Sequence, residues 1–141
     1  MKELKINHLA ALVAVVLQFV LGFLWYGNVL FGEAWMGMVG LDMATIEANP
    51  PGAGEWITNI FSAVVSMYVL AWLYTKMNVD TWLKGCLYGL LIGFSFVLLS
   101  IMTSGMFAKD PYGLAWITGG FTTVGLAIGG AVLGAWKKYK A

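Results

Sequence analysis

Four long apolar segments alternate with short polar segments along this chain, and the alternation predicts its architecture. The apolar segments cover residues 6–30, 56–75, 82–108 and 113–136, and none of them contains Asp, Glu or Arg. An α-helix needs about 20 apolar residues to cross the hydrocarbon core of a bilayer. The pattern therefore predicts an all-α membrane protein, a bundle of four transmembrane helices that forms a single domain over residues 1–141.

The polar breaks carry the residues expected at helix ends. Asn7 is a natural N-cap for the first helix. Residues 78–80 and 109–111 are short enough for tight turns between consecutive helices. The one long connection covers residues 32–55, where we expect a short helix lying in the membrane interface over 33–39 and a second one begun by Asp42.

Composition agrees with a lipid environment. The chain is 60% hydrophobic and 11% charged, with a mean hydropathy of +0.81, whereas average soluble chains carry about 25% charged residues. A soluble domain of this length could not bury so much apolar surface. Membrane lipids are therefore expected partners. Nucleic acid is not, because the chain has no long basic run.

The lysines predict the direction of the helices, since the chain has no arginine. If the N-terminus is cytoplasmic, only Lys109 lies outside, and the positive-inside rule strongly favours this orientation. We expect a multi-pass membrane protein with both termini in the cytoplasm. The lysines that would face the cytoplasm are Lys2, Lys5, Lys76, Lys84, Lys137, Lys138 and Lys140.

Polar residues within the spans predict a polar bundle interior. Gln18 lies near the middle of the first helix, and its amide needs a hydrogen-bond partner in hydrocarbon. We expect it to bond to Ser66 or to a threonine of the fourth helix, as structural support more often than as a substrate site. The residues predicted to face the interior are Gln18, Asn59, Ser62, Ser66, Thr122 and Thr123.

Glycines predict how the late helices meet, because small residues at every fourth position let helix backbones approach closely. One face of the third helix carries Gly85, Gly89 and Gly93, and is expected to continue through Val97, Ser100 and Ser104. The fourth helix has two such stripes, and we expect one to remain free for homo-oligomerisation. The two stripes are Gly125 with Gly129, and Gly130 with Gly134.

Groups for common chemistry are missing from the sequence. The single histidine, His8, stands at a helix start, and the spans contain no carboxylate pair for acid–base catalysis or proton relay. The lone Cys86 is expected to be a small buried hydrophobe. Methionines could bind Cu(I), but they lie near no His or Cys and are ordinary packing residues. We expect no catalytic residue, no metal and no cofactor.

One motif resembles a known family. The run from Leu24 to Met36 is similar to a segment of small bacterial membrane proteins that are grouped as domain of unknown function seventeen sixty-one. This chain differs at Asn28 and Glu33, where members often have proline and lysine. The resemblance implies the same four-helix topology and a place in the bacterial cytoplasmic (inner) membrane. Because the family has no established activity, no catalytic residues can be carried over from it. The matching positions are Trp25, Tyr26, Phe31, Gly32, Trp35 and Met36.

These observations leave two classes of function open. The leading expectation is a non-enzymatic protein, either an accessory subunit that binds other membrane protein subunits or a homo-oligomeric scaffold. The alternative is a small transporter or channel for a neutral or lipophilic solute, with a path along Gln18, Ser66 and Asn59.

Overall fold

The computed structural model describes residues 2–141, and four of its helices are long and apolar enough to cross a membrane. The predicted all-α class and the four candidate spans are confirmed. The spans are α1 (His8–Trp25), α4 (Ala53–Lys76), a continuous stretch made of α5 (Trp82–Ile92), the π-helix η1 (Gly93–Leu98) and α6 (Leu99–Ala108), and α7 (Tyr112–Ala135). The shorter elements are α2 (Gly32–Val39), α3 (Met43–Ala48) and the strands β1 (Leu4–Lys5) and β2 (Lys138–Tyr139).

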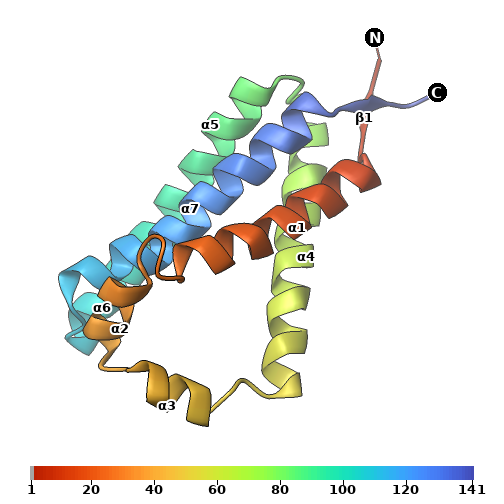
Figure 1. The fold of residues 1–141 in the computed structure, drawn as a ribbon. Coiled ribbons are helices and arrows are strands. Elements are labelled where there is room, and N and C mark those ends of the chain that lie inside the picture. The colour runs from red at the N-terminus through yellow and green to blue at the C-terminus, as the bar shows by residue number, and fades with distance from the viewer. Residues whose placement is uncertain (1) are drawn as a thin grey trace.

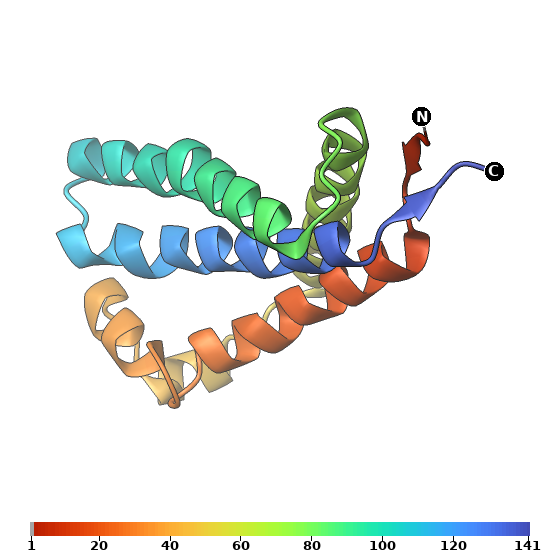
Figure 2. The same ribbon diagram turned by 90° about the horizontal axis from the view of Figure 1, so that it is seen from above.

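Three of the spans lie side by side, with α7 in the middle (Figure 2). One neighbour of α7 is α1, and the other is the α5–η1–α6 stretch. Within the most apolar window of each span, 61% of α7 is buried, against 17–22% of the other three. The fourth span, α4, crosses this layer and contacts α1 and α7. The bundle is therefore organised around α7.

Glycines bring α5 and α7 into backbone contact, as predicted. A Cβ added at Gly85 would overlap the carbonyl oxygen of Gly130, and one added at Gly89 would overlap that of Leu126. The second stripe of α7 is not free, which corrects the expectation of a spare glycine face. Gly125 lies against the Gln18 side chain of α1, and Gly129 lies against Gln18 and Met67 of α4. Both stripes are used within one chain.

The π-helix η1 changes the face that the third span presents to α7. Gly85, Gly89 and Gly93 follow each other at steps of four, but the next buried residue is Leu98, five positions on, which packs against Gly119. A π-turn accommodates one extra residue and so restores the face after the insertion. The predicted continuation is therefore wrong: Ser100 and Ser104 are exposed, and Val97 turns toward a groove described below.

Two of the helix starts are capped as predicted. The Asn7 side chain accepts hydrogen bonds from the backbone N–H groups of Leu9 and Ala10, and Asp42 accepts one from Thr45 at 2.7 Å. The first helix, however, ends at Trp25, five residues before the predicted end at residue 30. The chain turns back there, because the N–H of Gly32 donates to the carbonyl oxygen of Gly27.

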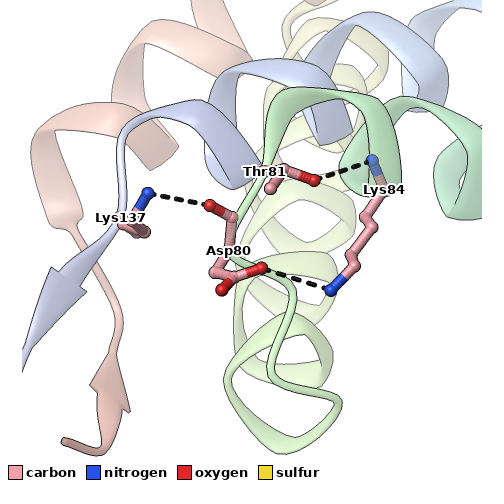
Figure 3. A network of polar contacts seen from close by, with 4 residues as sticks. All are labelled: Asp80, Thr81, Lys84 and Lys137. Atoms are coloured by element: carbon pink, nitrogen blue, oxygen red, sulfur yellow. Dashed lines mark hydrogen bonds and ion pairs between the residues drawn. The ribbon is translucent and has the colours of Figure 1, made fainter.

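Both chain termini lie at one end of the bundle, called the terminal end here, and α2 and α3 lie at the other, the loop end (Figure 1). At the terminal end β1 pairs antiparallel with β2, and the Asn7 amide donates to the Trp136 carbonyl oxygen. Figure 3 shows the turn before α5, where Lys137 donates to the backbone oxygen of Asp80 and Lys84 pairs with its carboxylate. The termini are thus tied to the bundle.

Candidate binding groove

Helix α4 packs on the bundle only in its second half. Met67, Leu70, Ala71 and Tyr74 are buried in the core, whereas residues 53–62 are all exposed. Figure 1 shows α4 diverging from α1 and α7 toward the loop end, where α3 and its flanking loops span the distance to α2. The loop-end half of α4 therefore stands away from the rest of the chain.

Side-chain size on α1 explains this divergence. Near the terminal end, α1 meets α4 on the side that carries His8, whose ring contacts Tyr68. The next residues on this side, Ala11 and Val15, are small enough to be buried in the core. Farther along, the same side of α1 carries Phe19, Phe23 and Tyr26. Small residues let two helices touch, and aromatic rings hold them apart. The two helices therefore form a wedge that opens toward the loop end.

The wedge encloses a groove of about 790 Å³. Its walls come from α1, α4 and α7, with Ile92 and Val97 from the π-helix region. The surface is mainly apolar. Toward the terminal end its lining reaches Leu70 and Leu73 of α4, beyond the buried Met67, which sits against Gly129. Toward the loop end it shares Trp56 and Asn59 with a smaller hollow that also contains Glu55. The groove therefore has a mouth at the loop end and an inner end within the bundle.

Gln18 lies on the groove wall, but its hydrogen bonds differ from those predicted. Its Nε2 donates to the Gly125 carbonyl oxygen at 2.9 Å and to the Ala14 carbonyl oxygen at 3.3 Å. The expected partner Ser66 instead donates to the Ser62 carbonyl oxygen at 2.7 Å. The prediction was wrong because a glycine exposes its own backbone to the amide, whereas a helical serine readily bonds the carbonyl four residues back.

The other residues predicted for a polar interior are divided between two places. Thr123 is buried against Gly93 of η1, and its hydroxyl donates to the Gly119 carbonyl oxygen at 2.8 Å. Thr122 is half-buried on the groove wall. The remaining three do face the bundle side of α4, but the divergence of α4 leaves them exposed in the groove rather than enclosed: Asn59, Ser62 and Ser66.

The motif at the end of α1 builds the corner between α1 and α2. The Trp25 Nε1 donates to the Ile117 carbonyl oxygen of α7 at 2.9 Å, and its ring lies 4.7 Å from that of Phe31. Tyr26 meets Trp35 edge to face at 5.4 Å. Gly32 is buried against the Tyr26 carbonyl oxygen, where a side chain has no room. Met36 accepts the Leu41 N–H through its carbonyl oxygen, which ends α2. These residues are structural.

The aromatic groove wall was missed from the sequence, although a signal for it exists. Along the side of α1 that faces α4 the residues change from alanine and valine, at Ala11 and Val15, to phenylalanine and tyrosine, and this gradient predicts that a neighbouring helix will diverge. The lining residues include no Lys, Asp, Glu or His. Across residues 2–141, no cluster of three or more His, Cys, Asp or Glu could hold a metal ion. The groove therefore offers amides, hydroxyls and apolar surface.

Comparison with known proteins identifies one family. The family described as "Protein of unknown function (DUF1761)" matches residues 9–134, which include the spans and the corner motif. Neither a curated protein nor a solved structure shows significant similarity to the chain.

Proposed function

Because this chain belongs to the DUF1761 family, which has no activity to transfer, we propose from its own residues that it is a non-enzymatic membrane protein that binds a lipophilic solute. The observation that carries this proposal is the groove of about 790 Å³ between α4 and the three-helix layer. Concave sites for small molecules typically measure about 300–1,000 Å³ and are mainly apolar with a few polar groups. The groove has these properties.

The shape of the groove favours binding or uptake over conduction. A channel needs a continuous path through the bundle, and the lining of this groove includes no residue of α1 before Gln18 and none of α7 after Leu126. The polar path from Asn59 through Ser66 to Gln18 therefore ends among packed side chains. A solute that entered at the loop end would remain in one half of the membrane unless α4 moved.

We place the protein in the bacterial cytoplasmic membrane with the terminal end in the cytoplasm. Every lysine except Lys109 lies in the terminal half of the molecule or on the terminal strands, and the positive-inside rule then places this end inside. In this orientation the groove mouth opens to the outer leaflet. The solute would come from the lipids or the periplasmic side.

The proposal is tested by what the purified protein carries. Native mass spectrometry after mild extraction should detect a small-molecule adduct. Ser62→Phe fills the groove and should remove the adduct. Ile60→Phe, on the same helix at a half-exposed position outside the groove, should keep it. Equal adducts in both variants would contradict the proposal, as would their absence from the wild type under every extraction condition.

A second candidate, an accessory subunit or homo-oligomeric scaffold, is favoured by the free half of α4. Residues 53–62 are all exposed, and polar side chains such as Asn59 can bond across helices in a membrane. In this case a helix of a second copy or of another subunit would occupy the wedge. Ser62→Phe would then convert an oligomer mass to a monomer mass, whereas under the first proposal the protein mass stays constant and only the adduct is lost.

A further inference from the structure

The groove also carries information about the class of solute, an inference that rests on the proposed function. The first clue is size. A volume of about 790 Å³ lies in the range that holds one drug-sized ligand, so the groove suits one chain and its head rather than a lipid with two chains. The apolar walls around Phe19 and Leu70, toward the inner end of the groove, suit the apolar chain of the solute.

The second clue is which polar groups are available. Gln18 donates both amide hydrogens to backbone carbonyl oxygens, and the Ser66 hydroxyl donates to the Ser62 carbonyl oxygen. Within residues 2–141, the side chains of Asn59, Ser62 and Thr122 donate no hydrogen bond to protein. Asn59 and Ser62 stand three residues apart, hence on one face of α4. They form a pair of donors near the groove mouth.

The third clue is charge. No lining residue carries a charge, and an ionised head in an apolar site costs several kcal/mol unless it is paired. The closest acid, Glu55 at the mouth, accepts a hydrogen bond from the Gly52 N–H at 2.7 Å and so caps α4. The negative charge of Glu55 repels an anionic head group. The Glu55 carboxylate already accepts the Gly52 N–H, and this bond competes with an ion pair to a cationic head group.

We propose that the groove binds an uncharged single-chain amphiphile whose hydroxyl, ester or ketone oxygen accepts hydrogen bonds from Asn59 and Ser62. The apolar chain extends past Phe19 toward Met67. The solute enters sideways from the leaflet at the loop end, between α1 and α4. The selective feature of the site is the absence of charge on the solute.

The test uses three probes with the same chain and different heads: dibromostearyl alcohol, dibromostearyl sulfate and dibromostearyl trimethylammonium. Bromine quenches tryptophan fluorescence on contact, and Trp56 lines the groove. The protein is placed in phosphatidylcholine vesicles, and the Trp56 signal is obtained as the difference between the wild type and Trp56→Phe. The measured quantity is the mole fraction of probe that half-quenches Trp56.

The alcohol should quench at a mole fraction at least about tenfold lower than either charged probe, the equivalent of about 1.4 kcal/mol. Asn59→Leu should weaken the alcohol about five- to tenfold by removing a donor. Ser62→Ala should weaken it less. Thr58→Val is the matched control, because the Thr58 hydroxyl bonds Gly54 and lies outside the groove lining. This control should match the wild type.

Failure of this inference is distinguishable from failure of the proposed function. If all three probes quench equally and Ser62→Phe abolishes the effect, the groove binds lipophilic solutes but does not select neutral heads, and the inference is overturned. The same holds if the ammonium probe binds most tightly or if Asn59→Leu binds the alcohol like the wild type. If no probe shows saturable quenching that depends on Ser62, the proposed function itself fails.

Discussion

Gln18 lies in the middle of a span, and the supporting role expected from the sequence remains a prediction, although its hydrogen-bond partners differ from those predicted. Its two amide donors bond backbone oxygens of α1 and α7. Its position beside Gly125 and Gly129 makes it a connection between two helices. We therefore expect the amide to support the structure and to contribute little to solute binding.

Gln18→Leu should lower the free energy of unfolding by about 0.6–1.7 kcal/mol, the range of hydrogen bonds between helices in membrane proteins. Quenching of Trp56 by the alcohol probe should change less than about twofold, since less than 0.4 kcal/mol is at stake. The measurements are denaturant unfolding in mixed micelles and the quenching titration. Val20→Leu, at a half-exposed position on the same helix, serves as the control. A large loss of binding with intact stability would show that Gln18 contacts the solute.

Glu3 provides a prediction about pH at the terminal strands. Its hydrogen bond with Lys140, at 2.7 Å, and the charge of that ammonium lower the pKa of the Glu3 carboxyl. A carboxyl whose folded pKa is lowered stabilises the folded state above its unfolded pKa, and this effect is lost as pH falls through the folded value. The Lys140 amide hydrogen bonds the backbone oxygen of Glu3. Its rate of hydrogen exchange should therefore increase relative to that of neighbouring amides below about pH 4. Glu3→Gln should remove that pH dependence.

Helix α5 shows how far glycines determine packing at the scale of elements. An added Cβ at Gly89 meets the α7 backbone, which cannot rotate away, whereas one at Gly54 in α4 meets nothing within 4 Å. Gly89→Ala should destabilise the protein by about 1–3 kcal/mol or more. Gly54→Ala should leave stability unchanged or raise it by up to about 1 kcal/mol. Thermal unfolding of the two variants tests this contrast, and equal behaviour would refute backbone contact between α5 and α7.

The π-helix makes a second prediction at this scale. Deleting Ser95, an exposed residue of η1, shortens the step from Gly93 to Leu98 to four residues and leaves the rest of the face in register. Deleting Leu87, which is also exposed, shortens the step from Gly85 to Gly89 to three residues. Every later residue of α5 is then rotated away from the residue of α7 that it contacts. The first variant should fold and unfold cooperatively, and the second should not. Size-exclusion profiles and circular dichroism distinguish the two results.

The extent to which the sequence predicts this fold depends on the kind of feature. The four candidate spans and the caps at Asn7 and Asp42 follow from local patterns, and the glycine contact of α5 with α7 follows from a repeat of four. The insertion in η1 is invisible to such a repeat, because helical hydrophobicity continues through it. The site is less predictable. The sequence places Asn59, Ser62 and Ser66 on the correct side of α4, but it does not show that they are exposed in a groove. Their exposure depends on how far α4 diverges, which depends on aromatic residues of another helix.

At the scale of the whole molecule, the groove and the terminal strands lie at opposite ends, so orientation decides which leaflet supplies the solute. The lysine distribution predicts that the terminal end is cytoplasmic. Single cysteines in a Cys86→Ala background can report this directly. Glu47, exposed in α3 at the loop end, and Lys138, exposed in β2 at the terminal end, are suitable sites.

A membrane-impermeant maleimide is applied to cells whose outer membrane is permeabilised and whose inner membrane is intact. Glu47→Cys should label fully, and Lys138→Cys should label only after the inner membrane is also permeabilised. The physical reason is that moving the terminal end outward would require translocation of seven lysines in place of one. The reverse labelling pattern would place the groove mouth in the cytoplasmic leaflet. The groove would then draw on a leaflet rich in anionic lipids, and the absence of charge in its lining would serve to exclude those lipids.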